Sequence, residues 1–467
     1  MINKKKSDIC IIGAGIGGLT AGALLTKQGY KVKIFEKESL IGGRALSLDT
    51  SSLTIDNYKD LLSRFHMCVP FSEPDLKTIF KEKMLQGYKL DLGYHAIGGG
   101  AVSNINSVLS EFDTHVEVLE SNVGLIKKNG FDFPFLSTAD KIKIFRHIFR
   151  LLFSGEKTMK RLDKVSMTET IGKYGKGKMK LVLEVFSRAI TTVNDLNLIS
   201  TGEMFRSQKN LLKGSKPVGY PKGGLVSINQ KLADFITQNG GEIHLKTPVK
   251  KILFDREKAA GVLVENKKQS FDFVVSNILV QDLFSIADEK YFPKDCVKNI
   301  KSLNGTGSLC AYYSLKKVNQ ELIGKTFLFI ERDVGVEGND VVGMIDFMAT
   351  LPESGLAPSS HYLIQSYIIC TSDEAKNKKI LEKLKIILDK NLENLIPDFR
   401  KHLRWAIYPA IWHLDGVAKT IDNIKPDIRT PVENLYIIGD CVKAPGIGVN
   451  CAINSARMLR DILSSSP

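Results

Sequence analysis

The stretch DICIIGAGIGGLTAGALL, residues 8–25, carries no charged side chain after Asp8. It is shorter than the roughly 20 apolar residues that a transmembrane helix needs, and five glycines interrupt it. Its apolar run at 9–12 is typical of a buried parallel strand. The residues after Gly18 have the pattern of a helix that ends near Gly29. We therefore expect a strand, a glycine-rich turn and a helix, and not a membrane span.

The glycines of this stretch follow the G-x-G-x-x-G pattern of dinucleotide-binding turns. Gly13 permits the tight turn, Gly15 lets a diphosphate approach the backbone, and Gly18 lets the helix pack closely on the strand. The helix N-terminus then presents free N–H groups and the positive end of its dipole to the phosphates. A second strand at 31–36 ends in Glu36. The separation along the chain between the glycine turn and Glu36 is close to the roughly 20 residues expected between such a turn and the acid that binds the ribose hydroxyls.

Two further segments narrow the nucleotide to FAD. The sequence IGGR, residues 41–44, adds a second glycine pair, and Arg44 is suited to bind a diphosphate with two parallel hydrogen bonds. Near the C-terminus a buried strand ends in Gly439-Asp440, where an acid can hold a ribityl chain or a bound water. Residues 445–450 then lead into an amphipathic helix. Its N-terminus would stabilise the negative charge that a flavin gains on reduction.

These motifs occur in a recognisable order: GxGxxG, Glu36, IGGR, YPKGG at 220–224, VVSN at 274–277 and GD…PGIGVNCAINSA at the end. In this order the sequence resembles the bacterial-type phytoene desaturase and carotenoid isomerase branch of the FAD-dependent amine oxidase superfamily, from residue 8 to about 463. The resemblance implies an α/β fold, in which a Rossmann-type FAD-binding domain is interleaved with an α+β substrate-binding domain. It also implies that the backbone of Val249 meets the adenine. The expected cofactor contacts are Gly13, Ala14, Gly15, Ile16, Gly17, Gly18, Glu36, Lys37, Gly42, Gly43, Arg44, Val249, Gly439, Asp440, Gly448 and Val449.

The resemblance also suggests domain boundaries. The FAD-binding domain is expected at 1–50, 215–305 and 425–467, the substrate domain at 87–214 and 306–424, and an insertion at 51–86. The family passes from GGR to its next motif more directly, so the insertion is a departure, and we expect it to act as a lid or an interaction surface. Asn450-Cys451 is a second departure, because desaturases of the family more often have Pro-Gly at this place.

Candidates for catalysis are fewer. Flavin dehydrogenation moves a hydride from a substrate carbon to flavin N5 and releases a proton from the neighbouring carbon, and the cofactor does most of this chemistry. Tyr94 and His95 follow a strand expected near the flavin, so either is a candidate acid or base. A structural role for His95 is the alternative. The aromatic residues of the segment 404–416 either line an apolar pocket or belong to the core. No metal-ligand spacing is present.

The sequence therefore predicts an FAD-dependent oxidoreductase that acts on an apolar isoprenoid or carotenoid-like small molecule. Desaturation is the leading reaction, while saturation and cis–trans isomerisation remain open. One alternative is a flavin amine or amino-acid oxidase, which the lack of Tyr or Trp at 447–449 disfavours. The other is a prenyl or lipid carrier of the GDP-dissociation-inhibitor type, which binds no FAD. The complete set of cofactor residues favours the enzyme.

Charge and cysteine content bear on location. The net charge of +14 favours anionic surfaces, or else reflects a lysine-rich solvated surface. The basic amphipathic segment 138–164 is suited to peripheral contact with an anionic membrane, the alternative being a helix packed on the core. The seven cysteines include no Cys-x-x-Cys pair, which favours a reducing compartment. We expect a cytoplasmic protein that has no signal peptide and no nucleic-acid partner.

Overall fold

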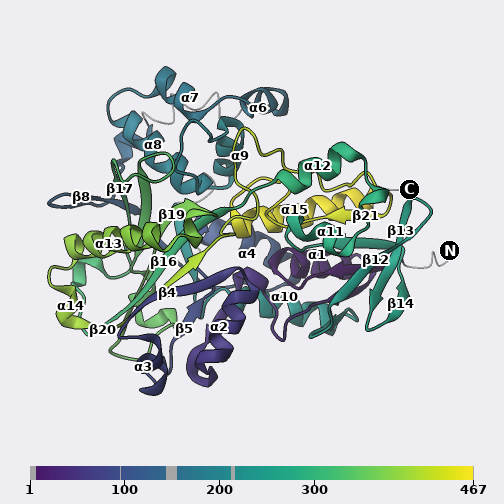
Figure 1. The fold of residues 1–467 in the computed structure, drawn as a ribbon, viewed down its shortest axis with the longest axis horizontal. Helices are drawn as coiled ribbons and strands as arrows, with labels where there is room; N and C mark the ends of the chain where they lie inside the picture. Colours follow the sequence, from purple (N-terminus) through teal and green to yellow (C-terminus); the bar gives the residue numbers. More distant parts are fainter. Residues whose placement is uncertain (1–6, 95, 143–154, 212–215, 466–467) are drawn as a thin grey trace.

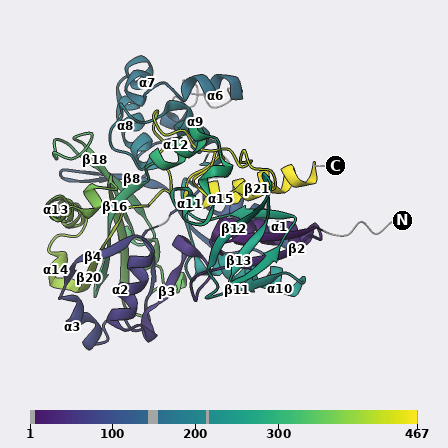
Figure 2. The same cartoon turned by 45° about the vertical axis from the view of Figure 1, so that its right-hand side comes forward.

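The computed structural model describes residues 7–94, 96–142, 155–211 and 216–465. Two large β-sheets dominate these residues, and Figures 1 and 2 show them next to each other, with the sheet that holds the N-terminal strand nearer to both chain ends. Within the described residues, no helix combines the length and the apolar character needed to cross a membrane.

The smaller sheet is parallel throughout. In spatial order its strands are β11 (Glu242–His244), β2 (Lys31–Phe35), β1 (Asp8–Ile12), β15 (Phe273–Ser276) and β21 (Leu435–Ile437). The central strand β1 is buried from Ile9 onward because both faces of the sheet are covered. The Rossmann-type α/β fold expected from the sequence is confirmed.

Helices and a small sheet cover this parallel core. α1 (Ile16–Lys27) contacts both α10 (Val226–Gln238) and α15 (Gly448–Ser464). An antiparallel sheet of β12 (Val249–Asp255), β13 (Lys258–Val264) and β14 (Lys267–Ser270) contacts β15 through β13. α1 is buried along almost its whole length, with Gly22 lying against Ile34 and Ile236. The apolar character of the opening stretch therefore reflects burial inside the protein.

The larger sheet has eight strands. Their spatial order is β4 (Met67–Glu73), β20 (Leu403–Ile411), β16 (Thr306–Leu315), β19 (Tyr362–Thr371), β18 (Val341–Asp346), β17 (Thr326–Glu331), β8 (Val123–Lys127) and β9 (Gly130–Asp132). Neighbours are antiparallel except β17 and β8, which are parallel. Helix α13 (Lys378–Leu395) packs on one face. The other face contributes to a core that also includes residues of β3 (Ser47–Asp49), β5 (Lys89–Asp91) and β10 (Val218–Pro221).

The remaining elements lie around the two sheets. β10 forms a small sheet with β6 (Ile97–Gly98) and β7 (Val118–Ser121), and β3 pairs with β5. A helical group at the top of Figure 1, with a hydrophobic cluster of its own, consists of α6 (Glu156–Leu162), α7 (Met167–Tyr174), α8 (Lys178–Thr191) and α9 (Thr201–Leu211). Other short helices are α4 (Asn104–Leu109), α11 (Leu283–Ile286), α12 (Lys294–Ser302) and α14 (Phe399–His402). Residues 143–154 of the basic amphipathic segment 138–164 lie outside the described residues, so membrane contact stays a prediction.

Three segments singled out in the sequence have definite places in the fold. The stretch 51–86 forms α2 (Ile55–Arg64), the edge strand β4 and α3 (Leu76–Lys81). Trp405 and Tyr408 of β20 are fully buried, which places them in the core. In YPKGG the chain turns after β10, where the N–H of Gly224 donates to the carbonyl of Pro221. Neither glycine of this turn lines the cavity described below.

The turn between β1 and α1 yields a first prediction. A Cβ at Gly18 would collide with the carbonyl oxygen of Gly13, which is backbone and has no room to move. We expect Gly18→Ala to lower the free energy of unfolding by about 3 kcal/mol or more, as measured by chemical denaturation. Gly172→Ala is the matched control, because this helical glycine has open space around it. It should be neutral or stabilising by less than about 1 kcal/mol. Equal effects of the two substitutions would contradict the packing argument.

Candidate functional site

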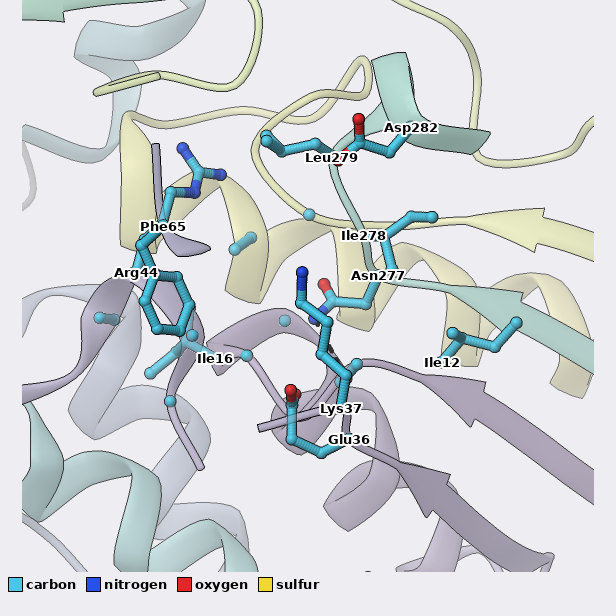
Figure 3. A pocket seen from close by; sticks show the side chains of 18 of the residues that line it. Ile12, Ile16, Glu36, Lys37, Arg44, Phe65, Asn277, Ile278, Leu279 and Asp282 are labelled. Carbon is cyan, nitrogen blue, oxygen red and sulfur yellow. Dashed lines mark hydrogen bonds between the residues drawn. The ribbon is translucent and has the colours of Figure 1, made fainter. Parts of the chain in front are cut away.

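A cavity of about 300 Å³ opens where the carboxyl ends of β1, β2 and β15 meet the N-termini of α1 and α15. This edge of a parallel sheet is the usual ligand-binding place in open α/β folds. Its walls come from segments that are far apart in sequence, as Figure 3 shows. The lining residues are Ile12, Gly13, Gly15, Ile16, Gly17, Phe35, Glu36, Lys37, Gly42, Gly43, Arg44, Ala45, Arg64, Phe65, His66, Pro248, Val249, Asn277, Ile278, Leu279, Asp282, Ser285, Ile286, Leu414, Gly439, Asp440, Gly448, Val449 and Ala452.

The glycine turn forms the floor of the cavity. Gly13 has a φ of +99°, a conformation that L side chains rarely adopt. A Cβ at Gly17 would lie 2.6 Å from Oδ1 of Asn277, and one at Gly43 would lie 3.3 Å from Cα of Gly15. The backbone of the two glycine segments is thus close together and bare of side chains. A diphosphate can therefore reach the N–H groups of the first turn of α1.

Glu36 follows β2 directly and is 94% buried, with 6% of its surface exposed. Its Oε2 accepts from the N–H of Ala14 at 2.7 Å, and its Oε1 accepts from the N–H of Glu38 at 2.9 Å. Burial raises the pKa of Glu36 above its usual value, and these two hydrogen bonds offset only part of that effect. The carboxyl group is therefore held in one orientation at the cavity wall, as a ribose-binding acid requires.

Arg44 and Asp440 form a partly buried ion pair at the other end of the cavity. Arg44 Nη2 lies 2.6 Å from Asp440 Oδ1, and Nη1 donates to the carbonyl of His413 at 2.9 Å. Asp440 Oδ2 accepts from the N–H of Gly416 at 2.9 Å. Burial opposes ionisation of Asp440, yet the neighbouring guanidinium and the Gly416 N–H hold its pKa below the usual value. The pair keeps a fixed cation and a fixed anion beside the site.

The structure brings most of the expected cofactor contacts together. Fourteen of them line the cavity: Gly13, Gly15, Ile16, Gly17, Glu36, Lys37, Gly42, Gly43, Arg44, Val249, Gly439, Asp440, Gly448 and Val449. Ala14 and Gly18 belong to the glycine turn but do not line the cavity. The N–H of Ala14 donates a hydrogen bond to Glu36, and Gly18 packs on Gly13. The individual role of each residue stays a prediction.

Other lining residues were not expected from the sequence. Asn277 follows β15, and its Nδ2 donates to the carbonyl of Gly13 at 3.3 Å. The signal for Asn277 was available, because it ends the VVSN motif at the carboxyl end of a parallel strand. Arg64, Phe65 and His66 come from the segment 51–86, which was predicted to be an insertion, and no local pattern pointed to them.

The structure describes only one of the two candidate catalytic residues, Tyr94. Tyr94 is buried, and its hydroxyl donates to Oδ2 of Asp346 while its ring stacks on that of Tyr367 at 5.6 Å between centroids. Burial raises the pKa of Tyr94 well above its usual value, so it remains protonated. Tyr94 does not line the cavity, and its catalytic role stays a prediction. His95 lies outside the described residues.

The carboxyl group of Glu36 can be tested directly. We expect Glu36→Gln to weaken FAD binding by about tenfold to a hundredfold, because hydrogen bonds to a charged group contribute about 1.5–3 kcal/mol. Fluorescence titration of the apoprotein with FAD measures the effect. Glu242→Gln is the control, since Glu242 lies on the adjacent strand β11 and pairs with Lys33 away from the cavity. An unchanged affinity of the Glu36 variant would refute the ribose-binding role.

Two buried carboxyl groups predict a pH dependence of stability. Asp91 accepts from Ser47 and Tyr220, and Asp346 accepts from Tyr94, yet burial raises the pKa of each carboxyl to about 6. The unfolded value is near 3.9, so the folded state binds more protons. Their contribution to the free energy of unfolding is full below about pH 4 and is lost as the pH rises through 6, by about 3 kcal/mol per group.

The measurement is chemical denaturation at several pH values between 4 and 8. Asp91→Asn and Asp346→Asn should each flatten the decline in stability. Asp295→Asn, at an exposed position of α12, should leave the decline unchanged. A decline of equal size in all three variants would show that these carboxyl groups do not cause it.

The chain is similar to known proteins over most of its length. A family model described as flavin containing amine oxidoreductase matches residues 16–458. A 1-hydroxycarotenoid 3,4-desaturase from Flavobacterium sp. (strain P99-3) is 22% identical, and the alignment covers 98% of this chain and 99% of the relative. A 4,4'-diapophytoene desaturase (4,4'-diapolycopene-forming) from Methylomonas sp. is 26% identical over 57% of this chain and 52% of the relative. An oxidoreductase from Methanosarcina mazei has a similar fold, with a TM-score of 0.71, 22% identity and coverage of 97% of this chain and 100% of that one.

Proposed function

Because the chain belongs to the flavin containing amine oxidoreductase family, we propose that this FAD-dependent oxidoreductase desaturates an apolar isoprenoid or carotenoid-like substrate. The observation that carries the proposal is the similarity of the chain, over nearly its full length, to a 1-hydroxycarotenoid 3,4-desaturase. The similarity to a diapophytoene desaturase supports the same class of substrate. Saturation or isomerisation of a polyene would use the same site.

The residues at the cavity fit FAD. The bare glycine backbone at the first turn of α1 suits a diphosphate, and the oriented carboxyl of Glu36 suits a ribose. Arg44 and Asp440 would hold the diphosphate and the ribityl chain. When bound, FAD supplies the acceptor for a hydride from a substrate carbon.

The start of α15 supplies an electrostatic contribution of the protein itself. Gly448 and Val449 belong to its first turn and line the cavity. Free N–H groups and the positive end of the helix dipole therefore face this space, where they stabilise negative charge. Residues 447–449 include no Tyr or Trp, so this segment offers no aromatic cage for an amine. That composition favours an apolar substrate over an amine.

The test uses purified protein loaded with FAD, phytoene dispersed in detergent and a quinone as electron acceptor. Each new double bond lengthens the conjugated chain, so we expect the polyene absorbance to move to longer wavelength. Protein depleted of FAD is the control and should give no shift. Hydrogen peroxide release with amines, without any change in the polyene, would instead identify an amine oxidase. Protein that retains no FAD would support the carrier alternative.

A further inference from the structure

The insertion at 51–86 contributes part of the cavity wall. α2 ends at Arg64 and β4 begins at Met67, and the corner between them, Arg64–His66, lines the cavity. Figure 3 shows Phe65 and Arg44 on one side of the cavity and Leu279 and Asp282 on the other. We call the corner Arg64–His66 the strap.

One end of the strap is fixed beside Glu36, the acid predicted to bind the ribose. Arg64 Nη1 lies 2.9 Å from Oε2 of Glu38, which is buried two residues after Glu36. Arg64 Nη2 also lies 3.0 Å from Oδ2 of Asp60, one turn earlier in α2. A carboxylate shielded from water holds a cation more firmly than an exposed one does. The C-terminus of α2 is therefore tied to the end of β2.

The other end of the strap is fixed beside the Arg44–Asp440 ion pair. The carbonyl of His66 accepts from the N–H of Trp412 at 3.3 Å. The imidazole ring of His66 lies edge-on to that of His413, with 4.9 Å between the ring centroids. The carbonyl of His413 in turn accepts from Arg44. His66 has a φ of +60°, a left-handed conformation that costs energy outside glycine. The contacts with 412–413 keep it in that conformation.

Phe65 lies between these two fixed ends. Its ring is only half-buried, and it lines a cavity whose floor is polar backbone. An apolar ring left partly open to water forgoes the gain of about 25 cal/mol per Å² that burial brings. A ligand in the cavity would cover the ring and recover that gain.

We propose that the fixed strap Arg64–His66 covers part of bound FAD, and that the ring of Phe65 packs on the cofactor and slows its release. The insertion thereby acts as a cofactor-retention element of this chain. This role depends on FAD binding and not on the substrate. A negative result in the desaturation assay would therefore not contradict the retention proposal.

The experiment compares FAD release from wild type, Phe65→Ala and Phe71→Ala. Phe71 is the matched control, because it is another half-buried phenylalanine of the same segment that packs on a hydrophobic core, as Phe65 does, but does not line the cavity. Holoprotein is diluted, and the rise in fluorescence of free flavin gives the dissociation rate. We expect Phe65→Ala to release FAD about tenfold faster than wild type, which corresponds to about 1.4 kcal/mol. Phe71→Ala should remain within about twofold.

Thermal unfolding separates retention from folding. The apoproteins of Phe65→Ala and Phe71→Ala should melt at similar temperatures, because each loses a half-buried ring packed on a core, while FAD should stabilise Phe65→Ala less than Phe71→Ala. Phe65→Leu, which keeps an apolar side chain, should restore most of the retention. Equal release rates for Phe65→Ala and Phe71→Ala would overturn the proposal.

A second variant covers the case in which Phe65→Ala does not fold. Arg64 is exposed over 46% of its side chain, so Arg64→Gln is expected to fold while losing the tie to Glu38. It should also accelerate FAD release, whereas Lys59→Gln, on an exposed part of α2, should not. Release from Arg64→Gln at the wild-type rate would overturn the proposal.

Discussion

The close backbone contact between β1 and the first turn of α1 is the constraint on which the rest of the site depends. Gly18 lies so near the carbonyl of Gly13 that no side chain fits between them. This contact brings the unpaired N–H groups of α1 to the carboxyl edge of the parallel sheet. The neighbouring strands end at the same edge, so Glu36 and Asn277 arrive beside the same turn. The close packing of Gly18 on Gly13 thus helps to bring the glycine turn, Glu36 and Asn277 together around the cavity.

A second constraint is electrostatic. Arg44 and Asp440 come from opposite ends of the chain, and removing both charges from water is costly. Further hydrogen bonds offset that cost, since Arg44 also donates to the carbonyl of His413 and Asp440 also accepts from Gly416. The pair therefore ties the segment 413–416, which follows the large sheet, to the parallel sheet. Organising these groups during folding lowers the cost of ordering them when a ligand binds.

The insertion shows where local sequence pattern stops being informative. Apolar spacing within 51–86 is a property of neighbouring residues, so helices could be expected there, and α2 and α3 form. The pairing of β4 with β20 joins residues more than 300 positions apart, and no local pattern encodes it. That pairing, with the ties at Arg64 and His66, places Phe65 at the cavity. Tyr94 is the opposite case. Its position after a strand predicted a place near the flavin, whereas its hydrogen bond to Asp346 holds it in the core.

The sequence by itself determined the parallel sheet, the glycine turn and fourteen of the 29 residues that line the cavity. These features depend on contacts within short motifs, where glycine spacing, a buried apolar run and a terminal acid have few alternative explanations. Only the tertiary structure decided that the insertion lines the cavity, that Asn277 supports the glycine turn, and that Tyr94, Trp405 and Tyr408 are buried. Each of these outcomes depends on long-range pairing, in which the burial of a side chain is set by segments distant in sequence.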